Sequence, residues 1–111
     1  MTTIDQAPDY NAQVLDLLNQ AQAKSHQKNF FEAEQLCLEA MALAAEHIGG
    51  ETSWVYGLCL EDLGAVRISE GKLDKADVTL RTALYVLERA LGADHEDTMR
   101  VFGRLHELYN M

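Results

Sequence analysis

The chain has 111 residues, of which 48% are hydrophobic and 24% are charged, with a single proline, so it has the length and composition of one folded globular domain. Eighteen acidic and nine basic residues give a formal net charge of -9. This charge repels a phosphate backbone and anionic lipid, which makes nucleic acid and membranes poor partners. It would attract a basic protein or peptide, although acidity is also a common means of staying soluble.

Residues 1–8 are expected to form a flexible arm in front of a domain at residues 9–111. The N-terminal sequence MTTIDQAPDY has neither the basic start nor the apolar core of a targeting segment. No stretch approaches the roughly 18 apolar residues that a membrane helix needs. We therefore expect a cytoplasmic protein.

Apolar residues recur at helical spacing along the chain. Between Leu73 and Leu91 they stand three or four positions apart, and residues 31–48 show the same pattern. The periodicity predicts an all-α protein with five helices. They are expected at residues 9–27, 31–47, 53–70, 73–90 and 96–110.

Glycines and short polar residues mark the ends of these helices. Gly49-Gly50 and Gly92 stand where a left-handed C-terminal cap favours glycine. Thr52 or Ser53 is a candidate N-cap of the third helix, and Asp94 of the fifth. The small residues within the helices predict places where two helices approach closely. These residues are Gly64, Ala65, Ala76 and Ala83.

Two parts of the chain resemble each other. Ala33 recurs 43 positions later as Ala76, and Leu63 recurs 42 positions later as Leu105. A period of this length is typical of helical repeat proteins. The predicted units are repeats at about residues 14–50 and 54–93 and half a repeat at residues 96–111.

This pattern resembles the tetratricopeptide repeat family, and within it the variety typified by kinesin light chain. Leu63-Gly64 resembles the motif of the family's first helix, and Ala76, Leu80 and Ala83 resemble that of its second helix. The segment ERALGADHEDTMRVFGRLHELY is similar to a helix end, loop and next helix of the family. The resemblance covers residues 14–110. It implies a right-handed stack of antiparallel helical hairpins that binds other proteins. We expect no catalytic activity, because the sequence contains no catalytic motif.

The sequence departs from the family at several positions. Arg67 replaces the expected aromatic residue, and Glu61-Asp62 and Gly103-Arg104 replace an asparagine pair of which Asn19 alone survives in the first repeat. If this pair clamps a peptide backbone in the kinesin-light-chain variety, the same clamp is not expected here.

The resemblance places a binding groove on the concave side, which the first helix of each hairpin lines. Apolar Leu58 and Ile68 beside acidic Glu61 and Asp62 would suit a peptide or partner helix with basic and apolar side chains. Alternatively, the two apolar residues only pack and the two acidic residues are a solvated face. The implied groove residues are Leu15, Leu18, Asn19, Gln22, Leu58, Glu61, Asp62, Ala65, Ile68, Arg100, Arg104 and Glu107.

The other chemically active residue types are expected to be structural. Cys37 and Cys59 lie in apolar helical patterns without metal-type spacing, so we expect buried free thiols. The four histidines form no metal-binding pair along one helix, and no catalytic motif or phosphate-binding loop is present. No metal or cofactor is predicted. Trp54 is expected to pack in the core, with the role of a binding anchor as the alternative.

The last predicted helix offers an alternative function. Its apolar residues make it a poor terminal cap for an array of two and a half repeats. Self-association through the terminal helices, as a structural unit that forms a homodimer or larger assembly, is therefore the second hypothesis. A third is an accessory subunit of an enzyme that supplies a surface and no catalytic group.

Overall fold

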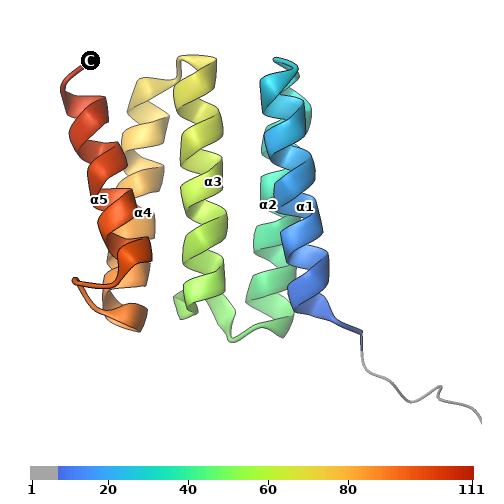
Figure 1. Ribbon diagram of the computed structural model, residues 1–111. Helices are drawn as coiled ribbons and strands as arrows, with labels where there is room; N and C mark the ends of the chain where they lie inside the picture. The colour runs from blue at the N-terminus through green and yellow to red at the C-terminus, as the bar shows by residue number, and fades with distance from the viewer. Residues whose placement is uncertain (1–7) are drawn as a thin grey trace, which may run out of the picture.

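Five α-helices and one short 3-10 helix make up residues 8–111, the part of the chain that this computed structural model describes (Figure 1). The five-helix, all-α prediction is confirmed, and each predicted end lies within one residue of the observed one. Residues 1–7 of the predicted arm lie outside the described part. The elements are α1 (Tyr10–His26), α2 (Phe30–His47), η1 (Gly50–Thr52), α3 (Trp54–Glu70), α4 (Leu73–Leu91) and α5 (Glu96–Tyr109).

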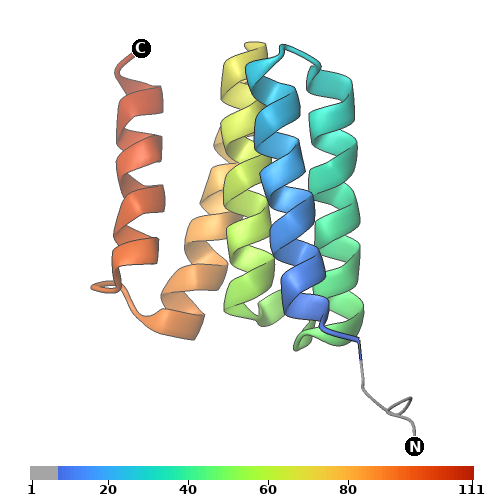
Figure 2. The ribbon, with the colours of Figure 1, turned by 45° about the vertical axis from the view of Figure 1, so that its right-hand side comes forward.

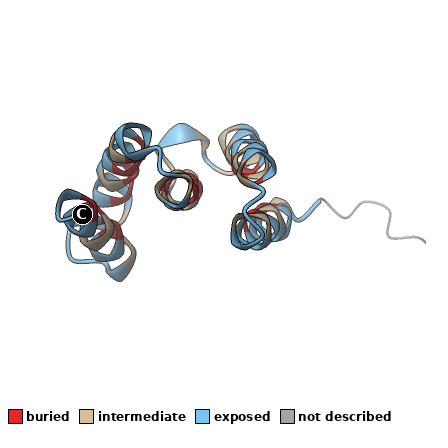
Figure 3. Cartoon of the chain, turned by 90° about the horizontal axis from the view of Figure 1, so that it is seen from above, coloured by how far each residue is buried: buried red, intermediate tan, exposed pale blue. Residues whose placement is uncertain are grey.

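The helices stand side by side as antiparallel hairpins. α1 pairs with α2, α3 pairs with α4, and α5 follows α4 at the C-terminal end (Figures 1 and 2). Seen along the helix axes, α1, α3 and α5 lie along one side of a curved row and α2 and α4 along the other (Figure 3). The first helices of the predicted hairpins therefore share one face, which we call the concave side.

The core consists of two clusters that meet at α3. One cluster joins α1, α2 and α3, and the other joins α3, α4 and α5. Cys37 and Cys59 are fully buried in the first cluster as free thiols, as predicted. Burial raises the pKa of each thiol to about 12, so both stay protonated and unreactive at neutral pH.

Close approach of α3 and α4 depends on two glycines of α3. A Cβ atom at Gly64 would lie 2.6 Å from Leu80 Cδ2, and one at Gly57 would lie 2.7 Å from Leu87 Cδ2. The sequence indicated Gly64 and missed Gly57, because an isolated glycine inside a helical pattern has no periodic signal.

The predicted alanines divide into two groups. Ala76 and Ala83 are fully buried on α4, in the cluster that α4 shares with α3 and α5. Ala65 is only half-buried and lines a hollow on the concave side. The prediction that Ala65 allows close packing of a helical hairpin is therefore wrong, and its predicted place in a binding groove stays a prediction.

Replacing Ala83 with leucine is expected to destabilise the fold by about 1–3 kcal/mol, because three extra carbon atoms enter a fully packed site. Chemical denaturation followed by circular dichroism measures the change. Ala90→Leu is the matched control, since it makes the same change at an exposed position of α4. Equal stabilities of the two variants would contradict this packing.

The glycines after α2 and α4 differ in conformation. Gly49 has φ 80° and ψ 5°, in the left-handed region as predicted. Gly92 has φ 95° but ψ 158°, so the left-handed cap predicted there is wrong. Its backbone is extended with positive φ, a conformation that glycine alone adopts readily, and it leads the chain directly into the loop before α5.

The predicted N-cap of α3 is confirmed, whereas that of α5 is wrong. Ser53 caps α3, where its Oγ accepts a hydrogen bond from the Tyr56 N–H at 3.2 Å. At α5 the cap is His95 and not Asp94: Nδ1 of His95 accepts from the Asp97 N–H at 3.1 Å. A neutral imidazole has one free acceptor nitrogen, so it replaces the carboxylate or hydroxyl that usually serves.

Candidate functional site

A hollow of about 200 Å³ lies on the concave side between the first halves of α1 and α3. Trp54 is 46% exposed and Leu15 59% exposed, so large apolar side chains meet solvent there. We call this site the apolar hollow. It is lined by Asn11, Val14, Leu15, Leu18, Trp54, Val55 and Leu58.

A second hollow, of about 330 Å³, follows along the same two helices and extends to α5. Its lining contains a carboxyl, a guanidinium, an amide, two hydroxyls and an imidazole, so we call it the polar hollow. It is lined by Ala21, Gln22, Ser25, His26, Asp62, Ala65, Val66, Ser69 and Arg104.

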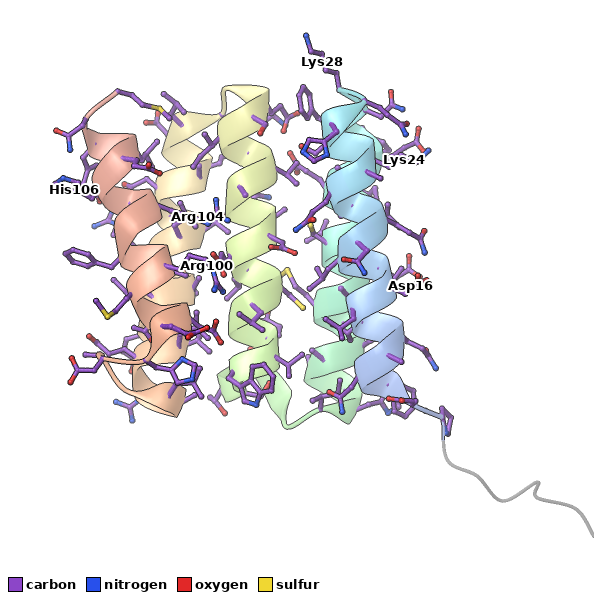
Figure 4. All side chains as sticks on the ribbon, in the orientation of Figure 1. Asp16, Lys24, Lys28, Arg100, Arg104 and His106 are labelled. Carbon is purple, nitrogen blue, oxygen red and sulfur yellow. The ribbon has the colours of Figure 1, made fainter. Side chains whose placement is uncertain are left out.

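Glu61 ties α3 to α5 through two arginines, whose side chains point from α5 toward α3 (Figure 4). Its Oε2 accepts from Arg100 Nε at 2.7 Å and from Arg104 Nε at 2.8 Å, and its Oε1 accepts from Arg100 Nη2 at 2.8 Å. The Glu61 side chain is 3% exposed. Neither sequence interpretation of Glu61 holds, because its charge is neither solvated nor free to attract a basic partner. We call these three residues the Glu61–arginine cluster.

The carboxyl group of Asp62, unlike that of Glu61, lines the polar hollow, and its pKa is raised. Burial raises the pKa of its carboxyl to about 6, with a further increase from the negative charge of Glu61, while Arg104 and Arg100 act in the opposite direction. The ionised form is thus poorly solvated within the polar hollow. A cationic side chain that entered this hollow would favour the ionised carboxylate.

The twelve predicted groove residues do not form one continuous groove. Most of them lie in three separate groups on the concave side. The apolar hollow takes Leu15, Leu18 and Leu58; the polar hollow takes Gln22, Asp62, Ala65 and Arg104. Glu61 and Arg100 belong to the Glu61–arginine cluster. Ile68 packs against the core between α3 and α4. Asn19 and Glu107 are exposed and line neither hollow.

Trp54 was placed in the core by the preferred sequence interpretation, which is wrong. It stands at the first position of α3, where its indole covers the edge of the apolar hollow. The spacing of four from Trp54 to Leu58 already put both on one helical face. The same periodicity could have added Ser69, which lies on the face of Asp62 and Ala65.

Two classes of site are absent from the described residues. Among residues 8–111, no three histidine, cysteine or carboxylate side chains are placed to hold a metal ion. No helix in this part of the chain has the length and apolar character required to cross a membrane.

The comparisons with known proteins agree with this architecture. The sequence profile of the tetratricopeptide repeat family matches residues 17–52, which span the second half of α1, all of α2 and η1. No curated protein sequence matches the chain. The matched segment overlaps the predicted repeat at about residues 14–50, and the match is loosely consistent with the kinesin-light-chain variety. Residues 17–52 are therefore similar to a tetratricopeptide repeat, and they lie within an all-helical repeat fold of the tetratricopeptide type.

Proposed function

We propose that this protein is a non-catalytic interaction module that binds a peptide or partner helix along its concave side. Tetratricopeptide repeats generally mediate protein–protein interactions. The observation that carries the proposal is the apolar hollow, where Trp54 and Leu15 remain exposed on the concave side. Tryptophan is one of the residue types enriched at binding hot spots.

The polar hollow indicates what accompanies the apolar anchor. Its poorly solvated Asp62 carboxyl favours a lysine or arginine side chain over a neutral or acidic one. Because Glu61 is already paired with two arginines, Asp62 alone supplies the attraction that the sequence assigned to both residues. The expected ligand therefore combines one apolar and one basic side chain.

The distance between the hollows sets the spacing of these two side chains. Val55 and Ala65, near the centres of the two hollows on α3, are ten residues apart, or about 15 Å at 1.5 Å per residue. An extended peptide advances about 3.3 Å per residue. It spans this distance in about four or five residues.

A set of labelled ten-residue peptides tests this spacing. Each carries one leucine and one lysine, separated by between about two and seven residues, and fluorescence anisotropy measures affinity. We expect the tightest binding at a separation of about four or five, because both hollows are then filled together. Affinity that does not vary with the separation would contradict simultaneous use of the two hollows.

Replacing Trp54 with alanine is expected to weaken the best peptide about 30-fold, which corresponds to the roughly 2 kcal/mol of a hot-spot residue. The same anisotropy assay measures the change. Phe31→Ala is the matched control, because Phe31 is 76% exposed on α2, outside both hollows. Unchanged affinity in the Trp54 variant would remove the apolar hollow from the binding site.

A further inference from the structure

The outward side of α5 carries a row of large side chains: Met99, Phe102, His106 and Tyr109. Their spacing of three, four and three residues puts them on one helical face. Met99 is 59% exposed, Phe102 63% and Tyr109 62%. In Figure 4, His106 lies on the opposite side of α5 from Arg100 and Arg104. We call these four residues the α5 row.

The preceding repeat shows how the corresponding face of α3 is used. Forty-two positions earlier stand Gly57, Leu60, Gly64 and Arg67 of α3, which pack against α4. Leu60 is buried against residues of α4, and Leu87 and Leu80 of α4 pack closely against Gly57 and Gly64. Arg67 Nη1 donates a hydrogen bond to Thr79 Oγ1 of α4 at 2.7 Å. The α5 row is thus the face on which a hairpin partner would lie, and within residues 8–111 no helix covers it.

The α5 row is nevertheless unsuited to a helix packed like α4. Met99 and His106 replace the two glycines that let α4 approach α3. A second helix would be held further away, so the row needs a partner surface with room for large side chains.

A hollow beside the row provides such room. It has a volume of about 260 Å³ and is lined by Arg81, Leu84, Phe102, Leu105, His106 and Tyr109. An apolar cavity of about 150 Å³ holds benzene, so this hollow can accept a phenyl ring. The side chain of Phe102 from a second copy is a phenyl ring of the size that this hollow can accept.

Charge favours a second copy at this end. No carboxylate lines the hollow, although the chain has twice as many acidic as basic residues. Arg81 is paired with Asp77 of its own helix, with 3.2 Å between Nη2 and Oδ2. Asp77 Oδ1 also accepts a hydrogen bond from the Tyr109 hydroxyl at 2.6 Å. Because Arg81 neutralises this carboxylate, two such surfaces meet with less repulsion than the net charge of the chain would cause.

The N-terminal end does not complement the α5 row. Asp16 and Gln20 of α1 stand 43 positions before Cys59 and Leu63 of α3, which are buried against α2. Both α1 residues are exposed, and Gln20 Nε2 donates to Asp16 Oδ2 at 2.7 Å. At these positions α1 therefore offers polar side chains, which favours the apolar α5 row over this face of α1 as a surface for self-association.

We propose that the α5 row binds the same row of a second copy, forming a two-fold, tail-to-tail dimer in which each Phe102 enters the hollow of the other copy. Aromatic side chains bury about 150–250 Å² each, so Phe102 and Tyr109 supply roughly 200–300 Å² per copy at their observed exposure. Val78 and Tyr85 of α4, each 61% exposed, extend the surface toward the roughly 800 Å² per partner of a standard interface. These side chains together cover less than a standard interface, as expected of a weak, reversible dimer.

Light scattering coupled to size exclusion, at concentrations from about 10 µM to 1 mM, tests the dimer. The mass of the unaltered chain is expected to rise from 12.4 kDa toward twice that value. Phe102→Asp should remain at the monomer mass, and Met99→Asp on the same row should act alike. Phe31→Asp, which makes the same change on exposed α2, should still dimerise. Circular dichroism checks that every variant is folded.

Three results would overturn the proposal. An unaltered chain that stays monomeric at every concentration would exclude self-pairing and leave the row for a different protein. A dimer that Phe31→Asp disrupts and Phe102→Asp does not would place the interface at the other end. A mass that grows beyond the dimer would indicate head-to-tail assembly. The peptide assay at the concave side is independent of all three.

Discussion

Replacing Glu61 with lysine is expected to destabilise the folded chain by about 3–5 kcal/mol, the range for a buried ion pair that loses one partner. The Glu61 side chain is 3% exposed and accepts three hydrogen bonds from Arg100 and Arg104. A lysine would put a third positive charge among two guanidiniums. Since Arg100 and Arg104 are 43% and 36% exposed, both can move into water, so most of the loss comes from the contact between α3 and α5.

Urea denaturation measures this loss, and amide hydrogen exchange locates it. Exchange is expected to rise first in α5, which the Glu61–arginine cluster holds against α3. Glu107→Lys is the matched control, because it makes the same charge reversal at an exposed position of α5. Comparable destabilisation by both substitutions would mean that net charge, and not the cluster, determines the stability.

Helical elements were predictable from this sequence because their signals are local. Apolar side chains three and four positions apart, with glycine after the helix, are properties of short windows. The incorrect predictions concern the ends of helices, where a choice between neighbouring residues or backbone conformations decides the structure. His95 and not Asp94 caps α5, and Gly92 adopts an extended conformation, because the path of the loop toward α5 decides both.

The site was predictable only in part, because its decisive contacts are distant in sequence. The family resemblance placed Glu61 and Asp62 in the groove, but the partners of Glu61 lie 39 and 43 positions further along. Nothing within one helix distinguishes a carboxylate paired with two arginines from one exposed to solvent. The prediction for Trp54 was wrong for a similar reason. Tryptophan is buried on average, and only the placement of α1 against α3 leaves its side chain lining a hollow.

Replacing Asp62 with asparagine is expected to stabilise the folded chain at pH 7 by roughly 3 kcal/mol at most. The pKa of this carboxyl rises from its ordinary value of 3.8 to about 6 on folding, and one pKa unit corresponds to about 1.4 kcal/mol. The folded chain therefore binds this proton more tightly than the unfolded chain. The contribution of Asp62 to stability falls as pH rises from about 3.8 to about 6, and it does not change below or above this window.

Urea denaturation of the unaltered chain and the variant, at pH values from about 3.5 to 7.5, measures this window. The difference in unfolding free energy is expected to be near zero at the acidic limit and to reach its maximum above about pH 6. Asp94→Asn, at an exposed loop position, controls for the general effect of one fewer negative charge. A difference that is the same at every pH would show that the carboxyl is well solvated.

The same Asp62 variant connects stability to binding. An amide keeps the shape of the side chain but cannot attract a cation, so affinity for the lysine-containing peptides is expected to fall while affinity for peptides without lysine stays unchanged. A variant that gains stability and loses this selectivity would show that a destabilising carboxylate serves the binding of a basic partner, as at other functional sites where activity and stability conflict. A gain in stability without any change in selectivity would separate the polar hollow from peptide recognition and leave the apolar hollow as the binding site.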